Sequence, residues 1–269
     1  MPKIFLAVLD KNRQEIFLRL KAFKNCGYLA GGTALAIQVQ HRRSYDFDIF
    51  VGDPVKETFR RKIIDFFSPE KFYLDNREQL SFEVGNHTGV TFLHYPYPRN
   101  HPLIPADGLS LADSRDIATD KAFTLGRRAT WRDYVDLYFL FKKEIISLGN
   151  LIESAEKKFQ KEFNRALFLE QLVYPCTSPA KAGRIRGFGP LIKRLRRPSE
   201  SPHFQDIVIA PIEFLGVSVP EETIKAFLKA SVRDYLRRRK LFVTDGEVER
   251  RLGDYQNFGG GGVGVGGGV

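Results

Sequence analysis

Two aspartates separated by a single residue stand in a segment that has the pattern of a β-strand. From Ser44 to Val51, one alternate set of residues is wholly apolar, and the other set contains Asp46 and Asp48. Residues two apart in a strand project to the same side, so both carboxylates face one spot. Such a pair resists desolvation unless a cation neutralises it. The pair predicts a site for Mg²⁺, which prefers oxygen ligands; two solvent-facing aspartates on an edge strand are the alternative.

A pair of glycines precedes this strand. Gly31 and Gly32 allow a ligand to approach the backbone closely, and Thr33 begins a helical pattern that runs to about Gln40. The free N–H groups at a helix start form an anion site that suits phosphate oxygens. Because a short loop then returns the chain to the aspartates, phosphates and metal would meet at one place. A two-metal site of this kind stabilises the attacking and leaving oxygens of phosphoryl transfer together.

The elements that must position these residues follow from hydrophobic periodicity. Helices are expected at residues 4–24, 33–40, 55–67 and 150–174, as a pair within 110–145, and at 221–240, with a strand hairpin within 79–98. Strands that precede helices favour an α+β fold, with a small mixed sheet, an N-terminal helix and a helical second half. We expect a core at residues 1–109, a helical domain at 110–240 and a flexible glycine-rich tail at 241–269.

Composition restricts the classes of function. The chain has 269 residues, 43% of them hydrophobic, and a net charge of +10. A basic globular protein suits nucleic acid, nucleotide phosphates or an acidic protein as a partner, although a solvated basic surface is the alternative. Two distant cysteines argue against a disulfide framework or a zinc site. Early charges and the absence of a long apolar run predict a cytoplasmic protein with no membrane segment.

The segment at residues 175–205 is rich in Pro, Gly, Lys and Arg and has almost no acidic residues. It is expected to form a mobile basic loop, and the family resemblance given below implies that it is an insertion. Its two interpretations are a solvated linker and an arm that binds a polyanion.

Taken together, the motifs resemble those of the AbiEii/AbiGii-type nucleotidyltransferases, which are toxins of abortive-infection and toxin–antitoxin systems within the DNA polymerase β-like superfamily. The superfamily pattern is a glycine pair followed, after a spacer, by two acidic residues separated by a hydrophobic one, and GG at residues 31–32 and DFDI at residues 46–49 match it. DIATDKAFTLGRR and RDYVDLYFL resemble the later helical signatures of the family. The resemblance covers residues 28 to 140 approximately.

The resemblance implies a nucleotide-binding role for the first group of residues. Gly31, Gly32 and Thr33 would hold the triphosphate of a nucleoside triphosphate. Arg42 and Ser44 also match the family motif, and they would contact the nucleotide or brace the loop.

It also implies catalytic roles. Asp46 and Asp48 would be catalytic and would bind Mg²⁺, with two ions expected. Lys121 would neutralise developing phosphate charge, and Arg128, seven residues further along the same helix face, would share in binding the nucleotide. Asp136 matches a position that the family uses at its site. The alternatives are an exposed helix lysine at position 121 and a capping or ion-pairing aspartate at position 136.

One position departs from the superfamily pattern. Its members often supply a third carboxylate from a later strand, and residues 89–93 contain none. Glu83, on the preceding strand, is a candidate replacement.

The expected reaction is attack of a hydroxyl on the α-phosphorus of a nucleoside triphosphate. By resemblance, the preferred acceptor is tRNA or another RNA, with a cognate antitoxin as a partner. The basic segment and the Arg237–Lys240 run suit an RNA acceptor. Two alternatives stay open: a transferase with a small-molecule acceptor, as in antibiotic nucleotidyltransferases, and a catalytically silent nucleotide-binding module that acts by binding a partner.

Overall fold

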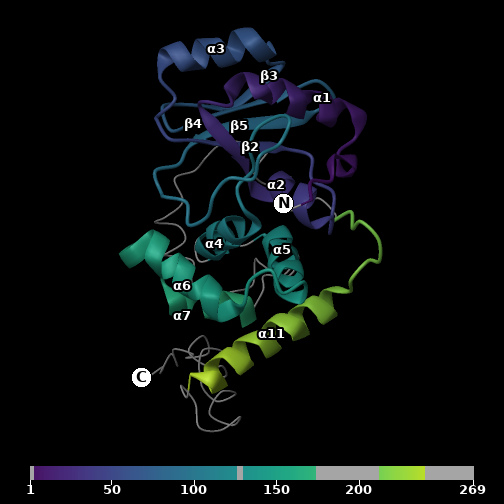
Figure 1. Ribbon diagram of the computed structural model, residues 1–269, viewed down its shortest axis with the longest axis vertical. Coiled ribbons are helices and arrows are strands. Elements are labelled where there is room, and N and C mark those ends of the chain that lie inside the picture. The colour runs from purple at the N-terminus through teal and green to yellow at the C-terminus, as the bar shows by residue number, and fades with distance from the viewer. Residues whose placement is uncertain (1–2, 126–129, 174–211, 240–269) are drawn as a thin grey trace, which may run out of the picture.

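The computed structural model describes residues 3–125, 130–173 and 212–239 (Figure 1). A five-stranded sheet in the order β1-β2-β5-β4-β3 forms the first half of the molecule. The sheet is mixed, because β2 and β5 are parallel and the other neighbours are antiparallel. The strands are β1 (Gly27–Ala30), β2 (Phe47–Val51), β3 (Lys71–Asp75), β4 (Gln79–Val84) and β5 (Thr88–His94).

One face of the sheet is packed against aromatic side chains. The ring of Phe23 lies 5.1 Å from Phe92 of β5 and 5.7 Å from Phe67, and Phe67 lies 5.5 Å from Phe82 of β4, measured between ring centroids. These contacts bury one side of the central strands and stabilise this half. The helices that supply and surround the aromatic cluster are α1 (Lys11–Arg19), η2 (Leu20–Phe23) and α3 (Glu57–Phe67).

The opposite face of the sheet carries a row of polar side chains. Strand alternation places Asp48 of β2, Thr91 of β5 and Ser81 of β4 in one row across it, because their Cα atoms are register partners. Glu83 lies on the same face, one pair further along β4. We call this surface the polar face. It is the side of the sheet on which a ligand can meet the paired aspartates.

Helices make up the second half. Helix α2 (Gly31–Val39) connects β1 to the loop before β2, and it contacts both α4 (Ser114–Leu125) and α5 (Trp131–Lys142). Below these lie α6 (Leu148–Phe159), α7 (Arg165–Val173) and the long helix α11 (Glu221–Arg238) (Figure 1). Two further 3-10 turns are η1 (Leu6–Val8) and η3 (Gln160–Glu162). No helix in the described part of the chain is long and apolar enough to cross a membrane.

The α+β prediction is confirmed, as are the hairpin and the helices after residue 110. Three boundaries differ. The first expected helix is divided, since Asp10 caps a new helix at α1; the helix expected at 150–174 breaks at Gln160, where φ is 49°; and Asp46 lies just before β2 rather than within it.

Strand β3 was not predicted. Its five residues KFYLD are half-exposed or exposed and carry no clean alternation, so only pairing with β4 makes them a strand. Two predicted segments lie outside the described residues: the basic segment at 175–205 and the tail at 241–269. The expected division at residue 110 stays a prediction.

Candidate functional site

The glycine pair lets two charged side chains reach the start of α2. Gly31 has a positive φ of 65°, and a Cβ there would collide with the Asp48 carboxylate. A Cβ on Gly32 would lie 2.7 Å from Arg42 Nη2 and 3.2 Å from Ser44 Oγ. Both positions therefore require glycine, the first for its backbone conformation and the second for space.

Thr33 ties the first turn of α2 to the loop before β2. Its fully buried hydroxyl lies 2.8 Å from Ser44 Oγ and is hydrogen-bonded to the carbonyl oxygen of Asp46. Thr33 thus holds the loop and does not face a ligand. Its predicted contact with triphosphate would have to come from the backbone N–H, as at other helix starts.

The two aspartates are half-buried on the polar face. Asp48 is level with Ala30 of β1 on one side and with Thr91 of β5 on the other. Asp46 Oδ1 accepts a hydrogen bond of 3.2 Å from the backbone N–H of Gly89, and a Cβ at Gly89 would lie only 2.8 Å from the same oxygen. Gly89 therefore makes room for the Asp46 carboxylate.

No strand carboxylate of β5 joins them. The residue beside Asp48 is Thr91, whose hydroxyl lies 2.9 Å from that of Ser81. Glu83 is level with Gly89, so it lies on the same face as Asp46 with only the bare glycine between them. Its carboxylate is hydrogen-bonded to Tyr73 and to His87, the latter at 2.7 Å. Glu83 remains the candidate for a third carboxylate.

A buried charged network lies behind the glycine turn. Arg42 donates two hydrogen bonds to the Asp136 carboxylate, at 2.7 and 2.9 Å. Lys121 Nζ lies 2.6 Å from Asp136 and 2.8 Å from Asp133, and His41 Nε2 lies 2.6 Å from Asp136. The network joins α4 and α5 to the loop that follows α2.

Each pKa in this network is set by two opposing effects: burial, which disfavours the charged form, and neighbouring opposite charges, which favour it. Burial alone would raise the pKa of Asp136, but Arg42, Lys121 and His41 hold it well below its ordinary value. Burial alone would lower the pKa values of Arg42 and Lys121, and the neighbouring carboxylates raise both instead. For His41 burial dominates, so its pKa is lowered. The folded protein therefore holds a charged Asp136 and a neutral His41 at neutral pH.

This geometry changes the interpretation of two predicted site residues. Asp136 is fully buried and Lys121 is 8% exposed, so neither opens onto the polar face. The charge of Lys121 is already balanced by two carboxylates, and the ion-pairing alternative describes Asp136 better than direct contact with a ligand. Arg42 likewise braces the turn rather than facing solvent. Arg128 lies outside the described residues.

Arg132 is a site residue that the sequence reasoning missed. It is a half-buried arginine in the first turn of α5, and the charges of Arg42 and Asp46 both act on it. The arginine stood in the quoted RDYVDLYFL signature, so its identity was available. Its distance from Asp46 in the sequence gave no sign that the two would be close.

The donor set fits Mg²⁺ in part. Asp46 and Asp48 are oxygen ligands on one face, and Gly31 and Gly89 leave space around both carboxylates. Within the described residues no group of three or more His, Cys, Asp or Glu side chains could hold a metal. An ion would therefore take its remaining ligands from water and from substrate phosphates, as Mg²⁺ commonly does.

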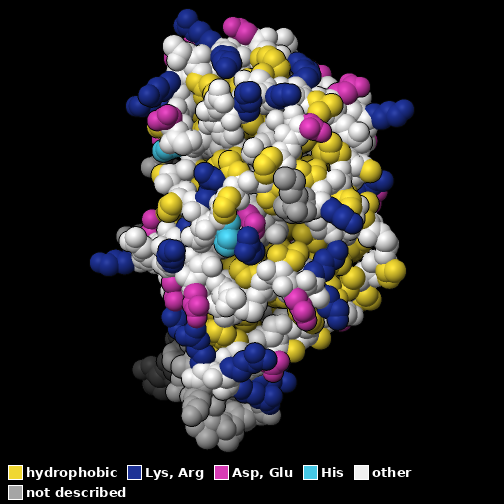
Figure 2. Space-filling model, viewed as in Figure 1, with side chains coloured by type: hydrophobic (Ala, Val, Ile, Leu, Met, Phe, Trp, Pro, Cys, Tyr) yellow, Lys and Arg dark blue, Asp and Glu magenta, His cyan; other side chains and the backbone are white. Residues whose placement is uncertain are grey.

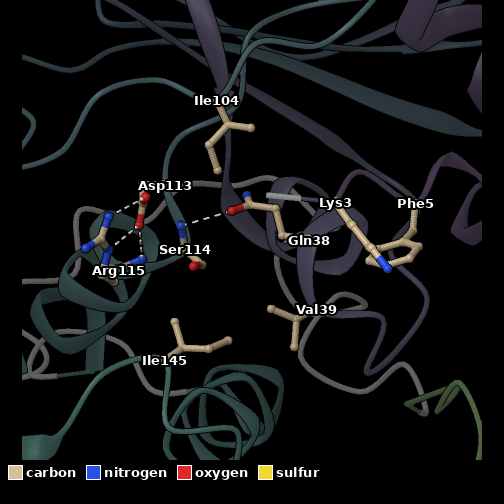
Figure 3. Close-up of a pocket in the computed structure, with 9 residues that line it drawn as sticks. All are labelled: Lys3, Phe5, Gln38, Val39, Ile104, Asp113, Ser114, Arg115 and Ile145. Carbon is tan, nitrogen blue, oxygen red and sulfur yellow. Dashed lines mark hydrogen bonds and ion pairs between the residues drawn. The ribbon is translucent and has the colours of Figure 1, made fainter. Parts of the chain in front are cut away.

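A separate pocket of about 460 Å³ lies at the other end of α2 (Figure 3). Gln38 is one of its lining residues, and its Oε1 accepts a hydrogen bond of 3.1 Å from the N–H of Ser114. Arg115, which also lines it, is held by Asp113 at 2.8 Å. None of the predicted site residues lines this pocket, so it is distinct from the polar face.

Comparisons with known proteins give one clear relative. No protein-family model matches the chain. The uncharacterized protein aq_aa25 of Aquifex aeolicus is 30% identical over 176 residues, which cover 62% of this chain and 82% of that protein.

Similar solved structures are more distant. They include MenT4, a nucleotidyltransferase toxin of Mycobacterium tuberculosis, with a TM-score of 0.49, 13% identity and coverage of 90% of this chain and 87% of that one. The Megavirus polyadenylate synthase has a TM-score of 0.37, 14% identity and coverage of 91% and 53%. These TM-scores lie below 0.5, so no functional conclusion rests on them.

Proposed function

We propose that this chain, which belongs to the same family as the uncharacterized protein aq_aa25 of Aquifex aeolicus, is a metal-dependent nucleotidyltransferase. The observation that carries the proposal is the position of the Asp48 carboxylate directly against Gly31 at the start of α2. A carboxylate that can bind a metal thus lies directly beside a helix start that can bind phosphate. Together they form a site for a metal-bound triphosphate.

The proposed reaction transfers a nucleoside monophosphate to an acceptor hydroxyl. The acceptor oxygen forms a bond with the α-phosphorus, and the bond from that phosphorus to the α,β-bridging oxygen breaks. Its electron pair stays on the bridging oxygen, which leaves as part of pyrophosphate, and the acceptor proton passes to solvent or to a base. Bound Mg²⁺ would polarise the α-phosphate and neutralise charge on the leaving group.

The chain itself supplies binding and orientation. The backbone N–H groups of Gly32 and Thr33 would bind phosphate oxygens, and Asp46 and Asp48 would hold the metal. Ser44 fixes the loop through Thr33. Glu83, on the same face, would accept the acceptor proton by way of water.

Lys121, Asp136 and Arg42 would act as positioning residues in this site. Arg42 lies close to Gly32, while Asp136 accepts hydrogen bonds from two of the three nitrogens of its guanidinium. Lys121 in turn fixes Asp136 from α4. Arg128 is retained as a nucleotide-binding residue on the family resemblance alone.

An RNA acceptor, tRNA first, agrees with the charge of the chain. Lys225, Lys229, Arg233 and Arg237 recur every four residues along α11, so they share one ridge of that helix. Lys and Arg side chains are also spread over the face seen in Figure 2, including its lower end. Phosphates along one RNA strand could be neutralised by such a surface. A toxin that modifies tRNA, opposed by a cognate antitoxin, is the role that the motif resemblance supports.

One observation favours a second candidate. The position beside Asp48 on β5 is Thr91, a hydroxyl where the superfamily often has a carboxylate. A protein without that acid could bind a triphosphate and act through a partner without transferring the nucleotide.

The test is an incubation of the full chain with total tRNA, Mg²⁺ and each α-labelled nucleoside triphosphate in turn. Asp46→Asn and Asp48→Asn keep the side-chain shape and remove the charge, and Asp53→Asn, at an exposed position beyond β2, is the matched control. We expect label in tRNA with the wild type and Asp53→Asn, and a loss of at least about 100-fold in the other two variants.

The outcomes separate the candidates. Triphosphate binding without transfer to tRNA or to small hydroxyl compounds would favour the silent module. Label in tRNA that persists in both aspartate variants would refute the proposed metal site.

A further inference from the structure

Among the residues that the structure describes, Arg132 differs from the other cations near the site in having no hydrogen-bond or ion-pair partner. Arg42 and Lys121 each bond to buried carboxylates at 2.6 to 2.9 Å. Arg132 is half-buried on α5, yet no described residue accepts a hydrogen bond from its guanidinium or forms an ion pair with it. A guanidinium has five N–H donors, and leaving them unpaired away from water is costly. A half-buried arginine of this kind is suited to an anionic ligand.

Burial and a neighbouring positive charge both destabilise the charged form of Arg132. Burial lowers the pKa of Arg132, and the positive charge of Arg42 lowers it further, against the opposing effect of Asp46, Asp136 and Asp133. The carboxylates of Asp136 and Asp133 are occupied by Arg42 and Lys121. An additional anion on the Asp46 side would relieve the repulsion between the two guanidinium groups.

The backbone at Arg132 is fixed in place. Asp133, the next residue, accepts hydrogen bonds from Lys121 Nζ at 2.8 Å and from the Thr130 hydroxyl at 2.7 Å. Lys121 continues through Asp136 to Arg42, which contacts Gly32. A series of ion pairs therefore leads from the start of α5 to Arg42, which lies close to Gly32 at the start of α2. The positive dipole ends of both helix starts favour an anion.

We propose that Arg132 binds the β- and γ-phosphates of the nucleoside triphosphate and then the pyrophosphate that leaves. The role rests on the proposed function. The α-phosphate must lie at Asp46 and Asp48, since the metal is held there. The other two phosphates would then extend toward the glycine turn, where Arg132 would reach them from the first turn of α5. The planar fork of arginine matches two phosphate oxygens.

In this role Arg132 would stabilise the negative charge that develops on the leaving pyrophosphate. As the bond between the α-phosphorus and the bridging oxygen breaks, its electron pair adds negative charge to that oxygen. A guanidinium bound to the β-phosphate stabilises this charge without gaining or losing a proton. Lys121, whose charge is balanced by two carboxylates, is less suited to do so.

The test measures binding, without turnover. The probes are the α,β-methylene analogues of ATP, CTP, GTP and UTP, inorganic pyrophosphate, and the monophosphate of whichever nucleoside binds best, all with Mg²⁺. The proteins are the wild type, Arg132→Gln, Arg132→Lys and Lys142→Gln, an exposed lysine at the end of the same helix. Calorimetry gives the affinities, and thermal unfolding checks that each variant is folded.

We expect Arg132→Gln to weaken the triphosphate analogue and pyrophosphate by about 10-fold or more and to change monophosphate binding less than about twofold. Arg132→Lys should recover part of the loss and Lys142→Gln should match the wild type. Unchanged pyrophosphate binding in Arg132→Gln, or an equal loss for the monophosphate, would overturn the role of Arg132. If the folded wild type binds none of the triphosphate analogues, the proposed function itself fails.

Discussion

Among single residues, the glycines of the site are as important as its charged side chains. Gly31, Gly32 and Gly89 each lie against a charged side chain, and a Cβ at any of them would occupy the space that this side chain fills. Arg42 can lie against Gly32 because Asp136 fixes its guanidinium with two hydrogen bonds. The phosphate site and the buried network are therefore in direct contact through one pair of residues.

Gly32→Ala tests that contact. The new methyl group would lie 2.7 Å from Arg42 Nη2, and the guanidinium cannot retreat without breaking its bonds to Asp136. We expect a loss of about 1–3 kcal/mol in the free energy of unfolding and weaker binding of triphosphate analogues. Urea unfolding and calorimetry measure the two effects.

Gly85→Ala is the matched control, because a Cβ there meets nothing within 4 Å. Equal stability of the two variants would mean that Arg42 moves aside at little cost.

At the scale of elements, a second buried ion pair joins α4 to α6. Lys158 of α6 lies 2.5 Å from Asp120 of α4, and Tyr95, just after β5, donates a hydrogen bond of 2.7 Å to the same carboxylate. Lys158 is only 4% exposed, and its ammonium lies 5.0 Å from the centre of the Tyr95 ring. Burial raises the pKa of Asp120 although Lys158 opposes it. The pair thus fixes the helical half against the end of the sheet.

Lys158→Met should leave the Asp120 carboxyl without its cationic partner and raise its pKa further. We expect the free energy of unfolding to fall by about 3–5 kcal/mol, since breaking a buried pair costs more than replacing it. The double variant Lys158→Met/Asp120→Asn should be clearly more stable than Lys158→Met alone. Urea unfolding of the wild type, the single variants and the double variant completes the cycle. A double variant that is no more stable than Lys158→Met would argue against this account.

At the scale of the whole molecule, the two halves share one hydrophobic core and one charged network. Buried apolar residues from Leu9 to Leu236 form a single cluster that includes both the sheet and the helices. The network around Asp136 crosses the same boundary, from the loop after α2 to α4 and α5. We infer that loss of the network weakens the folded state as a whole rather than one half.

The pH dependence of unfolding tests this inference. The pKa of His41 is lowered from 6.5 in the folded state, so the unfolded chain binds a proton there that the folded chain excludes. Stability from this group is present above pH 6.5 and is lost as the pH falls below it. Asp136, whose pKa is also lowered, loses its contribution only below its ordinary value of 3.8. Between pH 7 and 5.5 the effect of His41 should stand alone within the network.

We therefore expect the wild type to lose up to about 1 kcal/mol of unfolding free energy between about pH 7 and pH 5.5 because of this group. His41→Gln, which can still donate to Asp136 and does not titrate, should lose less over the same interval. His87→Gln, whose imidazole is 90% exposed, is the control for removing a histidine. The same pH slope in the wild type and His41→Gln would contradict the prediction.

Elements with strong periodicity, and the residue types that carry the chemistry, could be predicted from the amino-acid order alone. The alternation before Val51, the glycine pair and the helical patterns after residue 110 each follow from neighbours along the chain. Local preferences suffice there, because one face of each element must be buried.

Which charged side chains are paired with one another, and which could bind a ligand, depends on contacts made in the folded protein. Lys121 and Asp136 looked like site residues in the sequence, and they neutralise each other behind the glycine turn. Arg132, which was given no role in the sequence analysis, has no partner among the described residues, and the charge of Asp46 acts on it. β3 exists because β4 offers it hydrogen bonds. Ion pairing and strand pairing join residues that are distant in sequence, so no local pattern encodes them.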